Sequence, residues 1–318
     1  MTTTRCSHCL AIVLVAMCLS VAAPVRAQAP APAQPRPRAQ APAPVKTPAP
    51  VKAIAPAKET APAAAPRPAV TAAEIEAQLE FLRTAKVVSS RPIGKGVTGA
   101  KRVTLSDGTR THEAAFQAVA KQSIGQDTPR TLRQPGEMRF VDHYRYNIAA
   151  WRLARMLGLE HMMPPTIERA IGPTGALSWW VDDVLMDEEE RQKTNARSPG
   201  GALELSRQFG RMSVFAELVR DTDRNKGNVV FTKTWRLVML DFTRAFRLTK
   251  ELKDAASLNA VDRGLLARLR TLTAPALKDA VEHHLTESEI EAVLARRDLL
   301  VSHFDRLIAQ RGEAVVLY

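Results

Sequence analysis

Residues 221–247 read Asp-Thr-Asp-Arg-Asn-Lys-Gly-Asn-Val-Val-Phe, then Thr-Lys-Thr-Trp, then Arg-Leu-Val-Met-Leu-Asp-Phe-Thr-Arg-Ala-Phe-Arg. Two apolar runs flank a polar break, a pattern that predicts a short β-hairpin. Polar residues precede the first run and follow the second. The hairpin would therefore bring Asp223, Asn228 and Asp241 together at its open end.

These three side chains have the chemistry that phosphoryl transfer requires. One carboxylate can accept a proton from an attacking hydroxyl group. The Asn oxygen and the second carboxylate are hard oxygen ligands, of the kind that Mg²⁺ takes when it carries a nucleoside triphosphate. The alternative is a surface hairpin whose turns are merely polar, and the placement of Asp241 at the end of the second strand weighs against it.

The same residues resemble a family. Asp223-x-x-x-x-Asn228, followed by an apolar hairpin and Leu-Asp-Phe, is similar to the catalytic and metal-binding loops of the protein-kinase-like superfamily. The Asp-Arg-Asn-x-x-Asn form is more similar to the phosphatidylinositol-kinase, HipA and secretory-pathway-kinase branches than to ordinary protein kinases. Thr-Asp-Arg-Asn-x-Gly-Asn and Asp-x-Thr-Arg-Ala-Phe-Arg also resemble uncharacterised exported bacterial kinase-like proteins, over about residues 86–318.

The resemblance implies an α+β, two-lobe protein-kinase-like fold, with an antiparallel sheet and one helix in the N-lobe and a mostly helical C-lobe. It also implies ATP and Mg²⁺ as cofactors, with Asp223 as the catalytic base or hydroxyl orienter and Asn228 and Asp241 as metal ligands. Arg224 either pairs with phosphate or braces the loop through carboxylates. For Arg244 we favour a structural ion pair.

A glycine-rich segment lies upstream, between expected strands at residues 86–93 and 101–105. Glycines let the backbone approach phosphate groups closely, so we expect a flap over the nucleotide. A plain turn is the alternative. The candidate phosphate-binding residues are Gly94, Lys95, Gly96, Val97, Thr98 and Gly99.

The sequence departs from the kinase pattern at two positions. A kinase needs a Lys on the third strand, oriented by a Glu on the next helix. The aligned residues here are Gln117, on the strand expected at 111–119, and Asn147, on a helix expected to begin near residue 138. Lys95 or Lys101 would then supply the missing charge from another direction. Either the site has been rebuilt, or phosphoryl transfer is weak or absent.

An apolar strand is expected at residues 177–186, where the two lobes would join. Its position makes Asp182, Asp183 and the backbone around Val184 to Met186 candidates for contact with adenine. The alternative is that Trp179 and Trp180 are core residues and that Asp182 and Asp183 are solvated. Downstream, the pattern predicts helices at residues 203–219, 265–272, 274–284 and 287–310.

The N-terminal 70 residues have a different composition. Residues 1–27 read as a signal peptide, with an apolar run from about Leu10 to Ala23 that is too short for a comfortable membrane span. An uncleaved N-terminal anchor is the alternative. Residues 28–70 hold 12 of the 21 prolines and read as a disordered, basic Ala/Pro-rich linker. We expect the kinase-like domain at 71–318, with lobes at about 71–186 and 187–318, in an exported protein that is periplasmic or extracellular. Thr71 and Glu74 would form a capping box at the start of this domain, which predicts a helix to about Thr84.

Composition also excludes several classes of site. All three cysteines lie within residues 1–27, so the mature chain would lack disulfides and thiol catalysis. Much of the net charge of +12 belongs to the signal and linker. The net charge is therefore weak evidence for a specific nucleic-acid partner. His283 and His284 are adjacent and lack the i, i+4 spacing of a zinc pair, so we do not expect zinc there.

The favoured function is an ATP- and Mg²⁺-dependent phosphotransferase whose acceptor is a protein, a glycan or a small molecule. A pseudokinase-like binding or scaffolding module is an alternative from another class, favoured by Gln117 and Asn147. Transfer of AMP on the same fold is a third possibility. The sequence identifies neither the acceptor nor the oligomeric state.

Overall fold

The computed structural model describes residues 70–94, 99–124 and 139–318. Its largest sheet is antiparallel, five-stranded and ordered β1-β2-β3-β7-β6. The strands expected at residues 86–93, 101–105 and 111–119 are confirmed with small changes in their ends. The sheet consists of β1 (Lys86–Pro92), β2 (Lys101–Ser106), β3 (Thr111–Gln117), β6 (Thr166–Ala170) and β7 (Thr174–Trp179).

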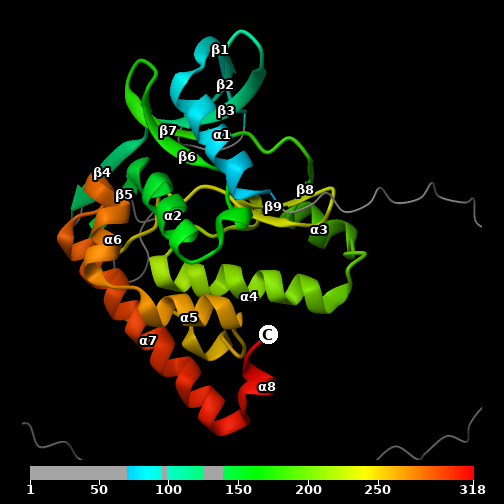
Figure 1. Cartoon of the computed structure of the whole chain (residues 1–318), viewed down its shortest axis with the longest axis vertical. Helices are drawn as coiled ribbons and strands as arrows, with labels where there is room; N and C mark the ends of the chain where they lie inside the picture. Colours follow the sequence, from blue (N-terminus) through cyan, green and yellow to red (C-terminus); the bar gives the residue numbers. More distant parts are fainter. Residues whose placement is uncertain (1–69, 95–98, 125–138) are drawn as a thin grey trace, which may run out of the picture. The chain divides into compact units, whose positions relative to one another are not determined.

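One face of this sheet is covered by α1 (Ala72–Thr84), which lies across it in Figure 1. The helix begins with the capping box that its sequence predicts: Glu74 donates its backbone N–H to Thr71 Oγ1 at 3.2 Å, and Thr71 N–H donates to the Glu74 carboxylate at 2.7 Å. Leu82 of α1 packs against Leu105 and Phe116 of the sheet. Because side chains alternate along a strand, neighbouring positions such as Ala115 and Gln117 belong to the opposite face.

Two boundaries differ from the sequence prediction. Residues expected to begin a helix near position 138 instead form β5 (Arg139–His143), which pairs with β4 (Ala120–Ile124), so the helix α2 is shorter, Arg145–Met156. The chain expected to be one strand at 177–186 is broken, because β7 ends at Trp179 and β8 (Val184–Asp187) pairs with β9 in another sheet.

The predicted hairpin is confirmed. It consists of β9 (Val229–Thr232) and β10 (Leu237–Met239), with β8 completing a three-stranded sheet in the order β10-β9-β8. Met239 pairs with Val229, and one residue further on Leu240 N–H donates to the Asn228 carbonyl at 2.9 Å. This register places Asn228 and Asp241 side by side at the open end.

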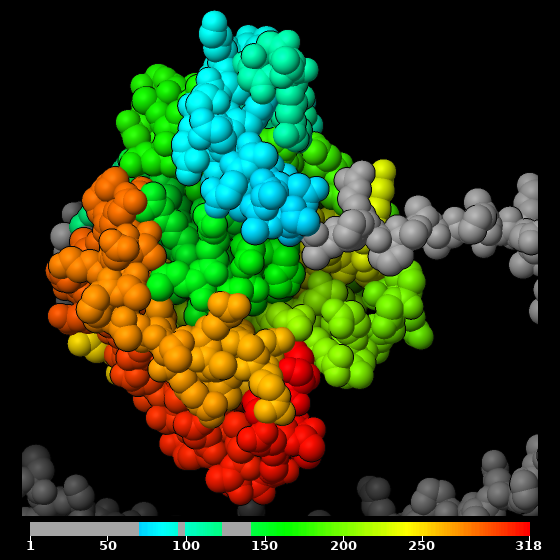
Figure 2. Space-filling model, viewed as in Figure 1, coloured from blue at the N-terminus to red at the C-terminus, as the bar shows by residue number. Residues whose placement is uncertain are grey.

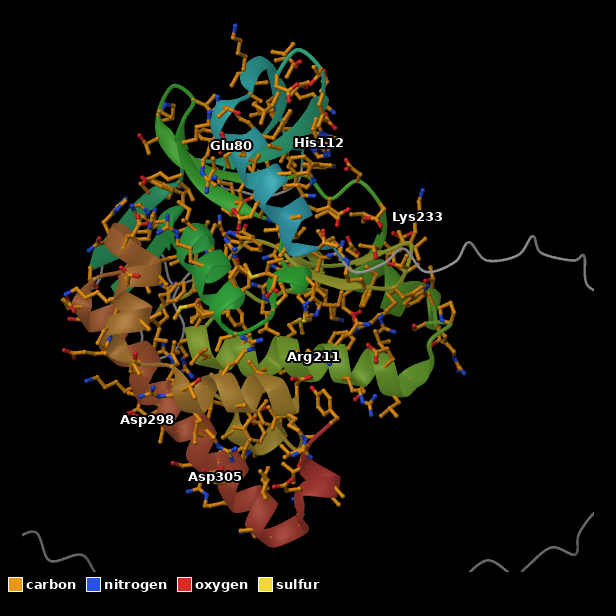
Figure 3. The ribbon with its side chains drawn as sticks, in the orientation of Figure 1. Glu80, His112, Arg211, Lys233, Asp298 and Asp305 are labelled. Atoms are coloured by element: carbon orange, nitrogen blue, oxygen red, sulfur yellow. The ribbon has the colours of Figure 1, made fainter. Side chains whose placement is uncertain are left out.

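The C-terminal part is helical, as predicted. Salt bridges join its helices: Arg211 pairs with Asp262 at 2.8 Å, and Arg270 pairs with Asp305 at 2.5 Å (Figure 3). The α-helices are α3 (Glu188–Thr194), α4 (Gly201–Val219), α5 (Arg263–Thr271), α6 (Ala274–Val281), α7 (Glu287–Arg311) and α8 (Glu313–Val316); the 3₁₀ turns are η3 (Glu160–Met162), η4 (Lys226–Asn228), η5 (Ala255–Ser257) and η6 (Glu282–His284).

The space-filling view shows α1 and the strands after it at one end of the face drawn, with α7 and α8 at the other (Figure 2). A large apolar core joins α2, α4 and the hairpin to α5, α6 and α7. Within residues 70–94, 99–124 and 139–318, none of the helices is both long and apolar enough to cross a membrane.

Candidate functional site

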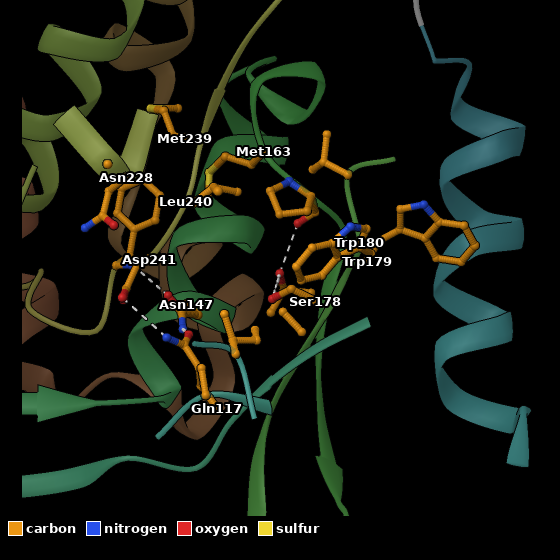
Figure 4. A pocket seen from close by; sticks show the side chains of 18 of the residues that line it. Gln117, Asn147, Met163, Ser178, Trp179, Trp180, Asn228, Met239, Leu240 and Asp241 are labelled. Atoms are coloured by element: carbon orange, nitrogen blue, oxygen red, sulfur yellow. Dashed lines mark hydrogen bonds between the residues drawn. The ribbon is translucent and has the colours of Figure 1, made fainter. Parts of the chain in front are cut away.

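A cavity of about 500 Å³ lies between the five-stranded sheet and the open end of the hairpin (Figure 4). This volume is within the range of small-molecule and cofactor sites. The sheet contributes the side of β3 and β7 that faces away from α1, and the hairpin contributes the segment from Met239 to Phe242. The polar residues of the wall include Gln117, Asn147, Thr166, Ser178, Asn228 and Asp241.

The structure brings Asn228 and Asp241 to the same wall of this cavity. Asn228 ends η4, and Asp241 follows β10 with a backbone φ of 51°. This left-handed conformation is uncommon outside glycine, and Asp and Asn are among the residues that tolerate it best. The turn it makes moves the chain away from the hairpin and leaves the Asp241 carboxyl group at the cavity.

The hydrogen bonds on the Asp241 carboxyl group come from neutral groups. Thr243 donates its hydroxyl to Oδ1 at 2.9 Å, and Gln117 donates its amide to Oδ2 at 3.3 Å. Burial raises the pKa of Asp241 above its usual value; the bonds from Thr243 and Gln117 lower it, and the charge of Asp142 raises it further. A divalent cation would supply the positive charge that this group lacks.

Asn228 completes a donor set that suits such a cation. Its side-chain nitrogen donates to the Asp223 carbonyl oxygen at 3.0 Å, which leaves the amide oxygen as a ligand atom. A carboxylate and an amide oxygen are the ligand types that Mg²⁺ and Mn²⁺ prefer. Asn228 and Asp241 therefore fit a hard divalent metal.

Asp223 lies beside these residues but outside the cavity wall, with its side chain 34% exposed. Its Oδ2 is 3.3 Å from Arg244 Nη1, and its Oδ1 accepts a hydrogen bond from the Asn225 side chain at 3.1 Å. Arg244 Nε also lies 3.2 Å from Asp142 Oδ2, so the ion pair expected for Arg244 is confirmed. Arg244 and Asn225 thus each hold one oxygen of the Asp223 carboxylate.

Arg224 braces the loop. Its guanidinium group donates to Asp221 Oδ2 at 2.8 and 2.5 Å, and to the carbonyl oxygens of Asn228 at 2.9 Å, Leu240 at 2.6 Å and Asp241 at 3.2 Å. The side chain is 10% exposed and does not line the cavity. Of the two roles considered for Arg224, these contacts favour the structural one.

A hydrogen-bonded pair of neutral side chains, Gln117 and Asn147, occupies the two positions that the resemblance aligns with the Lys and Glu of a kinase. Asn147 of α2 donates to Gln117 Oε1 at 2.6 Å, and Gln117 Nε2 in turn reaches Asp241 (Figure 4). Asn147 Oδ1 accepts the backbone N–H of Phe242 at 2.6 Å. The pair therefore connects the sheet, α2 and the segment after the hairpin without any charge of its own.

No protein-family model and no curated protein matches the chain. Among solved structures, hydra Fam20 with sugar has a TM-score of 0.59 and 16% identity, covering 78% of this chain and 93% of that one. The Golgi casein kinase has a TM-score of 0.53, and its Mn/ADP-bound structure 0.55, both at 16% identity over 77% of this chain and 78% of theirs.

The chain has a protein-kinase-like fold. In this kinase-like fold the antiparallel sheet lies in the N-terminal part and the helices in the C-terminal part, as the sequence predicted. In the orientation of Figure 1 the five-stranded sheet lies above the sheet that contains β8 and β9, and residues of both sheets line the cavity. The role of each side chain has to be judged from its own contacts, because the identity to these structures is low.

The glycine-rich segment of the kinase-like fold begins and ends at the cavity. Ile93 and Ala100 both line it, and the Ile93 N–H donates to the Ala100 carbonyl at 2.9 Å. Gly94 and Gly99 lie just inside this pair, and Gly99 has a φ of 67°. Lys95, Gly96, Val97 and Thr98 lie outside the described residues. The ends of the segment thus stand where a flap over phosphates would start.

The structure does not bring Lys101 or Asp183 to the cavity. Lys101 pairs with Phe116, on the face of the sheet that α1 covers, and its side chain is exposed. Asp183 lines a neighbouring cavity of about 170 Å³, and its carbonyl accepts the Lys233 N–H at 2.8 Å. Val184, whose backbone is also among the expected adenine contacts, does line the main cavity.

Sequence reasoning missed a cationic group beside the cavity. Arg102 lies over the Trp180 ring, 4.0 Å from its centroid, and forms an ion pair with Glu113. Arg102 is paired with Ala115 across the sheet, so it shares the face that lines the cavity. Ser106, Asp107 and Gly108 are turn-type residues, and counting back from them along the strand would have placed Arg102 on the face opposite to Lys101. His112, labelled in Figure 3, stacks on Trp179 and contacts Asp182 at 2.7 Å.

Proposed function

We propose that this chain is an exported phosphotransferase that uses ATP and Mg²⁺. The observation that carries the proposal is the meeting of Asn228 and Asp241, two hard-oxygen ligands, on one wall of a cavity of nucleotide size. The Golgi casein kinase has the same fold and was solved with Mn/ADP bound, which supports nucleotide and divalent metal binding here.

Each residue would then have a definite task. Asn228 and Asp241 would hold the metal, which neutralises charge on the phosphate groups when bound. Asp223 would orient the acceptor hydroxyl and take its proton, and Arg244 would fix the orientation of Asp223. The segment from Gly94 to Gly99 would cover the phosphates. In this scheme catalysis comes from positioning and from compensation of charge.

The test is calorimetric titration of ATP into the purified chain with and without Mg²⁺, in the wild type and in Asp241→Asn. The matched control is Asp298→Asn, because Asp298 is 68% exposed on α7 and far from the cavity (Figure 3). Binding that needs both Mg²⁺ and Asp241 supports the proposal. Absence of binding under both conditions would overturn it.

A second function, nucleotide binding without turnover, is favoured by one observation. The Gln117–Asn147 pair carries no charge, whereas a kinase positions the phosphates with a Lys. Mass spectrometry of candidate protein, glycan and small-molecule acceptors separates the possibilities. Added phosphate supports the phosphotransferase, added AMP supports nucleotide transfer, and saturable ATP binding with neither product supports a pseudokinase-like module.

Export is the part of the proposal that rests on the sequence of residues 1–27. N-terminal sequencing of the protein recovered from the periplasm or the medium should give a chain that begins at Gln28. Recovery only from the cytoplasm, with Met1 retained, would remove export from the proposal and leave the enzymatic part untouched.

A further inference from the structure

Three ligand-type side chains gather outside the cavity. Glu168 comes from β6, and His283 and His284 come from η6, more than a hundred residues later in the chain. Glu168 Oε2 lies 2.9 Å from His283 Nε2 and 3.4 Å from His284 Nε2. One donor atom from each of the three residues lies within 4.8 Å of the other two.

The tautomer of His284 prepares it as a ligand. Its Nδ1 lies 2.9 Å from the Val281 carbonyl oxygen, which can only accept, so Nδ1 carries the proton. In the neutral ring Nε2 then presents a lone pair. His284 is 1% exposed, and its buried Nε2 has no hydrogen-bond partner within the described residues.

This arrangement leaves a lone pair opposite a carboxylate. Two electron-rich atoms 3.4 Å apart repel each other unless a cation or a proton lies between them. His283 is 68% exposed and can present Nε2 from the solvent side. The cluster therefore has a buried ligand, an exposed ligand and a carboxylate directed at a common point.

A second layer of contacts orients the carboxylate. Tyr144 lies immediately before α2, and its hydroxyl donates to Glu168 Oε1 at 2.9 Å. This leaves Glu168 Oε2 for the two histidines. Arg152 neutralises the neighbouring Glu282 through a contact of 2.6 Å. Partners that hold ligand side chains in this way are typical of metal sites.

We propose that Glu168, His283 and His284 bind a divalent transition cation of the Zn²⁺ class, separately from the Asn228/Asp241 site. In a tetrahedral zinc site, bonds of about 2.0–2.1 Å place the donor atoms about 3.3 Å apart, between the two separations that involve Glu168. Nitrogen-rich ligands favour Zn²⁺ over Mg²⁺. The fourth position is left to water. The bound cation would connect β6 of the sheet to η6 of the helical part. The proposal of this metal site does not depend on the proposed enzymatic function.

The test measures Zn²⁺ binding to the untagged chain that begins at Gln28, which contains no cysteine, by competition with a chromogenic chelator, in excess Mg²⁺ so that hard-oxygen sites are filled. Glu168→Gln keeps the side-chain shape and should weaken Zn²⁺ binding by about 100-fold or more, and Tyr144→Phe by about 10-fold. The matched control is Glu291→Gln, since Glu291 is 65% exposed and pairs only weakly with Lys250 at 3.6 Å. It should leave the affinity unchanged.

His283→Ala gives an independent test, because this exposed side chain can be removed without opening the core. It should weaken Zn²⁺ binding as Glu168→Gln does while leaving the metal-free melting temperature unchanged. Zn²⁺ at about 100 times its Kd should raise the melting temperature of the wild type by about 5–10 °C, and that of the two variants much less. Equal Zn²⁺ affinity in the wild type, Glu168→Gln and His283→Ala would overturn the proposal.

Discussion

Replacing Arg224 by methionine should lower the free energy of unfolding by about 3–5 kcal/mol, because a buried carboxylate would lose its cation. The Asp221 side chain is fully buried, and two nitrogens of Arg224 lie 2.8 and 2.5 Å from its Oδ2. The same guanidinium group also binds the carbonyl oxygens of Asn228, Leu240 and Asp241, which methionine cannot do. For a domain of this size the melting temperature should fall by about 6–20 °C.

Urea denaturation followed by tryptophan fluorescence, without nucleotide or metal, measures this loss. The matched control is Arg83→Met, since Arg83 and its partner Glu80 are 52% and 64% exposed; it should cost less than about 0.5 kcal/mol. A double variant, Asp221→Asn with Arg224→Met, should lose less than the sum of the single changes. If Arg224→Met proves as stable as Arg83→Met, the bracing role is refuted. The alternative, in which Arg224 pairs with phosphate, would then be favoured.

Three further changes probe other contacts. Burial raises the pKa of Asp241 above 3.8, so as the pH is lowered protons should begin to compete with Mg²⁺ at a pH above 3.8, which calorimetry at several pH values can follow. In the metal-free protein the same shift should make the free energy of unfolding fall as the pH rises from 3.8 through the raised pKa of Asp241. Asn147→Leu leaves Gln117 Oε1 and Phe242 N–H without partners and should cost about 2–4 kcal/mol in urea denaturation; a midpoint unchanged from the wild type would contradict the pairing. Arg296→Lys keeps the charge of a fully buried side chain but loses most of its bonds to backbone carbonyls, so the loss should be about 1–3 kcal/mol by thermal unfolding.

Local patterns in the sequence predicted much of the fold. The apolar runs on either side of residues 232–235 gave the hairpin, and Thr71 with Glu74 gave the start of α1, because both signals arise from residues close together in the chain. The hairpin register then placed Asn228 beside Asp241. That part of the candidate site follows from counting residues along two paired strands.

Features that depend on distant contacts were beyond such counting. Residues 139–143 form a strand because they pair with residues 120–124. The helical periodicity of the residues after them led to a predicted start of α2 that is several residues too early. Lys101 lies on the α1 side of the sheet, which is decided by its pairing with Phe116. The adjacent pair His283 and His284 gave no reason to expect a third ligand, because Glu168 joins them from another part of the chain.

The neutral Gln117–Asn147 pair has a consequence for the order in which ligands arrive. A nucleotide alone would bring its phosphate charge toward Asp241, whose hydrogen bonds come from uncharged groups. Metal and nucleotide should therefore bind as mutually dependent ligands, each raising the affinity of the other by the same factor. The coupling can be measured as the change in ATP affinity per tenfold change in Mg²⁺ concentration. This change should be larger for this chain than for a kinase that has a lysine in place of Gln117.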